Sequence, residues 1–574
     1  MLLHLLVLAP FVAAILMVAT SKEDPKSSSR LAFLFALAFF GMSIALIAGG
    51  NQATEAVEWF RIPGAKGPVY YYLYSHGLGA WMVFLSTGLS LVALITARNT
   101  TCKNYRNFAI GIFALMGAMN GTFLAADAVL FFFFFEAMVI PAAILMAGFG
   151  GKERSKAAMT FAIYTLVGSA PMMVALWYLI SQADSSLLLS LAIALQNMPE
   201  GTQVAILVSF LLAFMVKTPV FPFHGWQAIS YSEAPAPLSA ILTGAMSKAG
   251  VFGFIAWVLP VFPMNTGLVN VMMWLGLVTA VYGALMALRA TDSKKLLAFS
   301  SMGHLGLAVA GVFTLSEAML PAVLVLLVAH GISAGAQFLL MGIGERMTGT
   351  RELDKLGGLA RVTPVFGTLF GFVAVLALAI PGTAGFVGEF TVLLSIWDGV
   401  GPVPALVAGL CIILSAAYML RFVQKVIFGE QKCEISGKRM TALEGSSIGV
   451  MGVLLLVFGM HPAFITNALQ LFDEQAIENM ARLAGEKPAV PTEQDEIVPS
   501  SIPGVDAEVD DSLASVAEPY TEEDLDSLKV NLKANGFTEE EIANLVEQLK
   551  AMQLEDSAEA DAAEPADAVE GGNK

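Results

Sequence analysis

Six titratable side chains of this chain lie inside long apolar runs, where an ionised group is costly. In chain order they are Glu136, Lys217, Lys248, His304, His330 and Glu389. Apolar surroundings disfavour the charged form of a glutamate or a lysine, and a neighbouring opposite charge restores it. A change in the partner's position therefore switches such a group between holding and releasing a proton. This is the chemistry of a proton relay, and it predicts a chain that moves protons at membrane depth.

Lys248 carries the strongest signal of the six. It lies near the middle of the apolar run 238–259, about 15 Å from either end at 1.5 Å per helical residue. A lysine can snorkel to an interface only from near a helix end, and inserting one at the centre costs about 3 kcal/mol. Lys217 lies two-thirds along the run 203–223, just before Pro219. The alternative for both lysines is a satisfied buried ion pair or a misplaced end of the run.

The two carboxylates and the two histidines each have a structural alternative. Glu136 follows five phenylalanines, and Glu389 follows a Pro- and Gly-containing break, yet each could be a helix-packing carboxyl that never titrates. A single membrane histidine is as often a hydrogen-bonding group between helices as a proton carrier. Because His304 and His330 lie in neighbouring predicted spans between Lys248 and Glu389, we favour the relay.

Other polar residues are less informative. Asp127 is either an N-cap or a functional group, His224 stays open, and Trp226 is predicted to be an interfacial anchor. No His/Glu spacing of a metal site occurs, and Cys102, Cys411 and Cys433 form no CxxC pair. No dinucleotide or phosphate-binding loop is present either. The sequence therefore predicts no metal and no cofactor on this chain, and no nucleic-acid partner.

The elements that position these residues are membrane spans. Of the 574 residues 56% are hydrophobic and 14% are charged, against about 25% charged residues in soluble domains. We predict an all-α polytopic membrane protein with about fourteen transmembrane helices. The expected spans are 2–20, 31–49, 76–97, 107–122, 124–148, 157–180, 203–223, 238–259, 269–288, 296–314, 318–343, 363–397, 402–427 and 444–466.

Two of these spans are predicted to be broken. Pro and Gly interrupt the spans at 217–223 and 381–385, and such breaks are tolerated where the backbone lines a cavity. Two broken helices five elements apart suggest an internal repeat of the kind found in transporters. Basic residues concentrate in the loops after odd-numbered spans, which predicts that these loops are cytoplasmic and both termini are on the opposite side.

The chain divides into a membrane domain, 1–470, and an acidic tail. Residues 471–574 hold 27 Asp and Glu against 6 Lys and Arg, a net charge of −21. We predict an acidic linker over 471–520, a helical hairpin over 521–552 and a disordered acidic end over 553–574. The tail is either a solvated appendage or a docking module, and its partner is not predicted.

The motifs that carry these residues resemble those of a known family, the antiporter-like membrane subunits of respiratory complex I, and most closely its bacterial M subunits. The resemblance covers roughly residues 75–430. It rests on DAVLFFFFFEA at 127–137, KTPVFPFHGW at 217–226, EAPAP at 233–237, TDSKKLLAFSSMGHLG at 291–306, HGISAGAQFLLMG at 330–342 and PGTAGFVGEF at 381–390. The chain departs from the family at Ile229 and Tyr231, where Asp and His are usual.

The resemblance implies a function and an architecture. Glu136 would pair with Lys217, Lys248 would be the central carrier, and a glutamate at 389 would mark the M type. Two inverted five-helix repeats are implied, about 107–259 and 269–427, in a bacterial inner membrane with both termini periplasmic. Flavin, iron–sulfur clusters and quinone would belong to partner subunits, with L-like and N-like neighbours in the bilayer. The alternatives are a subunit of a sodium–proton antiporter or membrane-bound hydrogenase, and a non-transporting scaffold subunit.

Overall fold

The computed structural model describes residues 1–20, 24–100, 104–264, 266–316 and 318–467. The chain divides into two units, Met1–Ala489 and Val490–Lys574, and the description below concerns the first. The predicted linker 471–520, hairpin 521–552 and acidic end 553–574 all lie outside the described residues.

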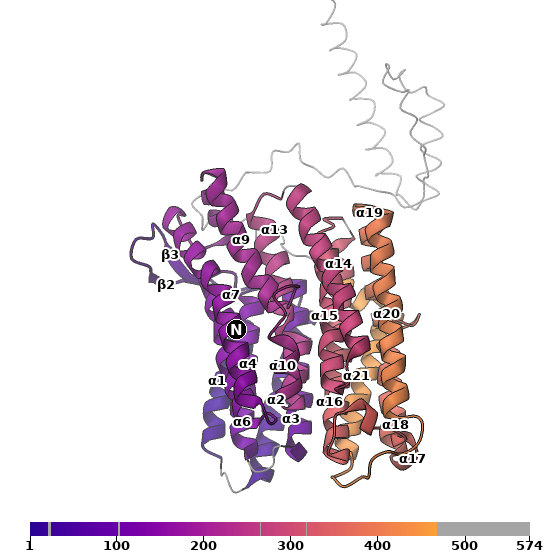
Figure 1. Cartoon of the computed structure of the whole chain (residues 1–574). Coiled ribbons are helices and arrows are strands. Elements are labelled where there is room, and N and C mark those ends of the chain that lie inside the picture. Colours follow the sequence, from indigo (N-terminus) through magenta and orange to yellow (C-terminus); the bar gives the residue numbers. More distant parts are fainter. Residues whose placement is uncertain (21–23, 101–103, 265, 317, 468–574) are drawn as a thin grey trace, which may run out of the picture. The chain divides into compact units, whose positions relative to one another are not determined.

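The first unit is a bundle of long helices (Figure 1). Its elements through residue 261 are α1 (Leu2–Val18), α2 (Pro25–Ala48), β1 (Gln52–Ala53), β2 (Val57–Arg61), β3 (Pro68–Tyr71), β4 (Tyr74–Ser75), α3 (Gly77–Thr100), α4 (Tyr105–Leu124), α5 (Ala128–Ala137), α6 (Val139–Phe149), α7 (Arg154–Gln182), α8 (Leu188–Gln196), α9 (Glu200–Lys217), α10 (Gln227–Glu233), α11 (Ala236–Ile241), η2 (Leu242–Met246), α12 (Lys248–Gly253), η3 (Phe254–Val258) and α13 (Leu259–Val261). The remaining elements are α14 (Thr266–Arg289), α15 (Ser293–Val312), α16 (Met319–Thr348), η4 (Leu353–Lys355), α17 (Leu359–Val362), α18 (Pro364–Leu376), α19 (Ala384–Gly399), α20 (Pro402–Val426), α21 (Ala442–Met460) and α22 (Ala463–Thr466).

The helical, membrane-spanning class is confirmed. Within the described ranges, twelve helical segments are long and apolar enough to cross a membrane, and α1 and α18 are shorter apolar helices. Each of the fourteen expected spans overlaps a helix. The number fourteen and the two inverted repeats stay predictions.

Both predicted breaks are present. α9 ends at Lys217, and the chain resumes its helical course only at Gln227. The second break separates α18 from α19, where Gly382 adopts a φ of +91° that favours glycine. Thr383 then caps α19 by accepting a hydrogen bond from the Phe386 N–H at 3.2 Å. The first break directly follows Lys217, and the second lies a few residues before Glu389.

The segment between α2 and α3 had no structural prediction and forms two short antiparallel strand pairs, β1 with β4 and β2 with β3. All five residues of β2 are exposed, and a salt bridge joins Arg61 to Glu58 at 2.8 Å. Its apolar side chains include Trp59, which packs edge-on against Phe133 of α5. This ribbon therefore covers the end of the bundle from which α5 begins.

The helix that carries Lys248 is buried along almost its whole length. It runs from Ala236 to Val261 through two π-helical turns, η2 and η3, on either side of α12. π-Turns loosen the regular hydrogen-bond ladder and are frequent at functional sites. The first of them ends at Met246, and only Ser247 separates it from Lys248.

Candidate functional site

Lys248 lies at the centre of the bundle and is fully buried. Its ammonium Nζ donates a hydrogen bond to the Thr243 carbonyl at 2.9 Å and lies 3.2 Å from Nδ1 of His330. The Thr243 carbonyl lies in the π-helical turn η2 and also accepts a hydrogen bond from the Ser247 hydroxyl at 3.0 Å. No ion pair joins Lys248 to a carboxylate in the described part of the chain. The central lysine is therefore held by a carbonyl dipole and an imidazole.

His330 connects Lys248 to the next histidine. It lies on α16, and its ring stacks on that of His304 with centroids 5.0 Å apart and planes 18° apart. Nε2 of His304 lies 3.0 Å from Oε1 of Glu389 on α19. Four of the six predicted residues thus form one continuous row from α12 through α16 and α15 to α19.

The contacts of His304 determine where its protons can be. Its Nδ1 lies 2.8 Å from the Ser300 carbonyl, which can only accept, so Nδ1 carries a proton. The proton between Nε2 and Glu389 then has two places. On Nε2 it makes an imidazolium facing a carboxylate, and on Glu389 it makes a neutral pair. Because the two groups are in contact, this proton can pass from one to the other while both side chains stay in place.

The contact between Lys248 and His330 is a second site of proton exchange. A protonated lysine donates to Nδ1 of His330, and a neutral lysine accepts from it. Nε2 of His330 has no hydrogen-bond partner in the described ranges. The imidazole is therefore able to receive a proton on one nitrogen and present another from the opposite side.

Glu136 and Lys217 are neighbours without direct contact between their charged groups. Nζ of Lys217 reaches the carbonyl of Phe135 at 3.4 Å and lies 4.6 Å from the centroid of the Phe135 ring. Both carboxylate oxygens of Glu136 are buried and have no hydrogen-bond partner among the described residues. The two charges are close enough to interact electrostatically, but no salt bridge closes the pair. The paired geometry implied by the family resemblance is therefore open in this structure.

The end of α9 packs closely against α12. A Cβ at Gly250 would lie 2.0 Å from Oγ1 of Thr218 and 2.6 Å from the Phe214 carbonyl, so only glycine allows this approach. The Thr218 hydroxyl is buried and has no partner within the described part of the chain. The close approach places Thr218, which follows Lys217, against Gly250, which lies two residues after Lys248. This contact joins the Glu136–Lys217 pair to the row that begins at Lys248.

Three other predicted positions are resolved. Asp127 is an N-cap that accepts from the Val129 and Leu130 N–H groups at 2.8 and 3.0 Å, so the capping alternative holds. His224 contacts the Tyr282 hydroxyl at 3.3 Å, away from the row. The prediction that Trp226 is an interfacial anchor was wrong: it is buried and donates to the Val216 carbonyl at 2.9 Å. The break at the end of α9 turns its indole inward.

A cluster of charges at one end of the bundle was missed by sequence reasoning. Arg351 bridges Glu233 at 2.5 Å and Asp292 at 2.6 Å, and Glu233 also accepts the Glu153 N–H at 2.8 Å. Burial opposes ionisation of Glu233, but the hydrogen bond from Arg351 and that from the Glu153 N–H outweigh it, so the pKa of Glu233 lies below its usual value. The sequence signal that could have revealed this cluster was the presence of Glu233 in the motif at 233–237 and of Asp292 in the motif at 291–306. This Arg351 cluster ties α10 to the start of α15.

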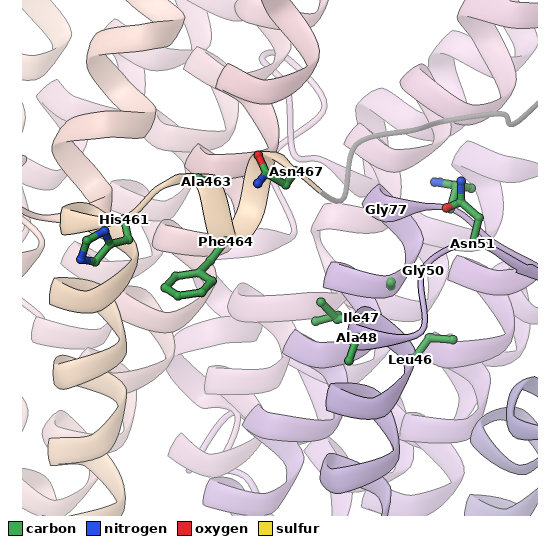
Figure 2. Close-up of a pocket in the computed structure, with 12 residues that line it drawn as sticks. Leu46, Ile47, Ala48, Gly50, Asn51, Gly77, His461, Ala463, Phe464 and Asn467 are labelled. Atoms are coloured by element: carbon green, nitrogen blue, oxygen red, sulfur yellow. The ribbon is translucent and has the colours of Figure 1, made fainter. Parts of the chain in front are cut away.

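Two cavities differ in their relation to the row. A cavity of about 450 Å³ lies between the ends of α2, α3 and α21 and is lined by His461, Phe464 and Asn467 (Figure 2). His76 also lines it. None of the six predicted relay residues lines this cavity. A second cavity, of about 20 Å³, lies directly beside His304 and Glu389.

In the described ranges, no group of three or more His, Cys, Asp or Glu side chains could hold a metal ion.

The chain is similar in sequence to known proteins. Residues 125–415 match the model of a family described as NADH:quinone oxidoreductase/Mrp antiporter. The chain is 31% identical to NADH-quinone oxidoreductase subunit M of Rhodobacter capsulatus over 82% of this chain and 94% of that protein. It is 30% identical to subunit M of Escherichia coli K12, over 80% and 95%.

Solved structures show the same fold. A chain of respiratory complex I from Thermus thermophilus, determined with bound NADH, matches with a TM-score of 0.71 at 32% identity. The match covers 84% of this chain and all of that one. A chain of the Mrp complex from a Dietzia species reaches the same TM-score at 20% identity, covering 83% of this chain and 98% of that one. The second likeness is one of fold alone. All six predicted relay residues fall inside the segment that matches the family.

Proposed function

This chain belongs to the NADH:quinone oxidoreductase/Mrp antiporter family, and from that membership we propose that its six intramembrane titratable residues form the path of a translocated proton. The chain is a proton-translocating membrane subunit of a complex I-type NADH–quinone oxidoreductase, a complex of several subunits. The residues of the path are Glu136, Lys217, Lys248, His330, His304 and Glu389.

One observation carries the assignment of the path. Lys248, His330, His304 and Glu389 form an unbroken series of contacts that crosses four helices inside the bundle. Buried charges are costly in a membrane, and a scaffold would gain nothing from four titratable groups in a row. The Lys248–His330 and His304–Glu389 contacts each join a proton donor to a group that can accept, and ring stacking joins the two histidines.

The mechanism follows from the electrostatic interaction between the Glu136–Lys217 pair and Lys248. When the charge on Glu136 and Lys217 changes, Lys248 experiences a different field and gains or loses its proton. His330 exchanges that proton with Lys248, and the His304–Glu389 pair holds or releases its shared proton in response. Redox chemistry takes place on other subunits, which we propose bind the flavin, the iron–sulfur clusters and the quinone. This chain supplies only groups that hold, orient and pass protons.

A sodium–proton antiporter or membrane-bound hydrogenase subunit is the alternative within the same fold. Subunit M relatives reach 31% identity, whereas the Mrp complex chain reaches 20% and the chain of an archaeal sulfane sulfur reductase 21%. Glu389 also distinguishes this chain from family members with a lysine there. We therefore propose L-like and N-like neighbours in a bacterial inner membrane, with both termini periplasmic.

The test is the substitution Glu389→Gln in the intact complex. It removes the carboxylate that shares a proton with His304 and preserves the size of the side chain. Proton uptake per NADH oxidised, measured in sealed membrane vesicles, is expected to fall while the complex still assembles. Glu345→Gln is the matched control, because Glu345 pairs with Lys294 outside the path. Wild-type pumping by an assembled Glu389→Gln complex would refute the assignment.

A further inference from the structure

Glu389 has a second carboxylate oxygen that the contact with His304 does not use. The side chain is 3% exposed, and Oε2 has no hydrogen-bond partner within the described part of the chain. A buried carboxylate oxygen without a donor is costly, especially when the group must carry a charge during part of its cycle. The surroundings of Oε2 therefore matter for the proton shared with His304.

Glu389 and His304 line the cavity of about 20 Å³ between α14, α15, α19 and α20. A site that holds one water needs roughly 10–15 Å³ and two to four polar partners. The space is large enough for one water. Its polar lining consists of Glu389, His304, Ser415 and Tyr418.

Tyr418 connects this cavity to the support of His304. Its hydroxyl and the Ser300 hydroxyl lie 2.8 Å apart, and both groups are buried. The Ser300 carbonyl in turn accepts the Nδ1 proton of His304 at 2.8 Å. The Ser415 hydroxyl is already committed to the Ile412 carbonyl at 2.8 Å and offers the cavity only lone pairs. Tyr418 therefore links the cavity to the residue that orients His304.

We propose that this cavity is a single-water site in which the water donates to Oε2 of Glu389 and is held by the Tyr418 hydroxyl, so that Tyr418 is a positioning residue for the shared proton. The inference rests on the proposed function of Glu389 and His304. A hydrogen bond donated to the carboxylate stabilises its charged form, which favours the proton on His304. Without the water, the proton shifts to Glu389 and the relay stops at a neutral carboxyl.

Gly303→Ala tests the site without removing any polar group. Gly303 lines the cavity, and a Cβ there would meet the Ala280 carbonyl at 3.4 Å and the Ala284 nitrogen at 3.7 Å, both ordinary contacts. The added methyl leaves no room for a water. Gly409→Ala is the matched control, because its Cβ meets Leu393 at 3.5 Å and lies outside the cavity.

Infrared difference spectroscopy of the intact complex provides the direct readout. A carbonyl band of protonated Glu389, identified by its loss in Glu389→Gln, should grow at least twofold at pH 7 in Gly303→Ala and in Tyr418→Phe. An O–H stretching band that shifts in H₂¹⁸O should be present in the wild type and in Gly409→Ala and absent in Gly303→Ala. Proton uptake per NADH should fall at least threefold in both cavity variants.

The outcomes separate the two proposals. If Glu389→Gln pumps normally, the proposed path fails whatever the cavity variants do. If Glu389→Gln stops pumping while Gly303→Ala and Tyr418→Phe keep wild-type bands and wild-type pumping, the water site is refuted and the path survives. A variant that loses pumping without changing the carbonyl band also counts against the site, because a merely structural effect would look like that.

Discussion

Replacing Lys248 with methionine should abolish proton pumping and leave assembly intact. Methionine nearly conserves the volume of the buried stem, and such exchanges cost less than about 1.5 kcal/mol. Removing a lysine from the bilayer centre relieves about 3 kcal/mol. The Thr243 carbonyl keeps its bond from Ser247, so only Nδ1 of His330 loses a partner, at about 1–3 kcal/mol. The free energy of unfolding therefore stays within about 2 kcal/mol of the wild type.

The effect on transport is much larger. Methionine holds no proton, and no other titratable group contacts His330 except His304 among the described residues. We expect proton uptake per NADH to fall at least tenfold, which corresponds to a barrier raised by at least about 1.4 kcal/mol. Dye-quenching in sealed vesicles measures uptake, and quinone reduction in uncoupled membranes reports assembly.

Lys294→Met is the matched control for this experiment. Lys294 is also buried, but it pairs with Glu345 at 2.7 Å at the start of α15 and lies outside the path. Its substitution should lower the melting temperature, because Glu345 loses its partner, and should leave the ratio of protons to NADH unchanged. Wild-type pumping by assembled Lys248→Met, or loss of pumping in both variants to the same degree, would refute the reasoning.

Three further predictions address the rest of the chain. Glu136→Gln should slow quinone reduction in coupled vesicles at least tenfold, because Lys217 loses its nearest carboxylate; an unchanged rate would exclude the coupling. Arg351→Ala should destabilise the purified complex by about 3 kcal/mol, since Glu233 is left buried and charged. In the wild type the contribution of Glu233 to the free energy of unfolding is complete above pH 4.5. It disappears as the pH falls through the lowered pKa of Glu233, which melting curves at pH 7 and pH 4 would detect. Truncation after residue 475 should leave pumping near the wild-type level, and protease added from the periplasmic side should remove the tail; cleavage only from the cytoplasmic side would reverse the predicted topology.

The spans and breaks could be predicted because both follow from local rules. An apolar run of about 20 residues has one stable conformation in a membrane, and Pro or Gly inside it interrupts the hydrogen-bond ladder. The π-helical turns around Lys248 had no such signal, since 242–246 and 254–258 contain ordinary helix residues. They arise from packing in a helix that is buried along almost its whole length. The strands between α2 and α3 were missed because they are only two to five residues long, too short to show apolar periodicity.

The site was predictable by residue type and only in part by geometry. Six titratable residues at membrane depth are identifiable because each one is costly where it stands. Their contacts depend on the rotation of α15, α16 and α19 about their axes, which apolar runs do not specify. Tyr418 and Ser300 gave no signal for the same reason: hydroxyl groups are tolerated in membrane helices, so their positions reveal nothing until the packing is known.

The two ends of the proposed proton path differ in how closely their charged groups approach one another. From Lys248 to Glu389 each side chain packs against the next, with polar contacts between Lys248 and His330 and between His304 and Glu389 and ring stacking between the two histidines. At the other end Lys217 contacts a backbone carbonyl instead of Glu136, and the buried Thr218 hydroxyl has no partner in the described ranges. Both features lie at the break that ends α9. Because α10 resumes after that break and ends at Glu233 in the Arg351 cluster, a displacement of the cluster reaches the break through a single short helix. We therefore expect that movement of the break between α9 and α10 would close or open the proposed path.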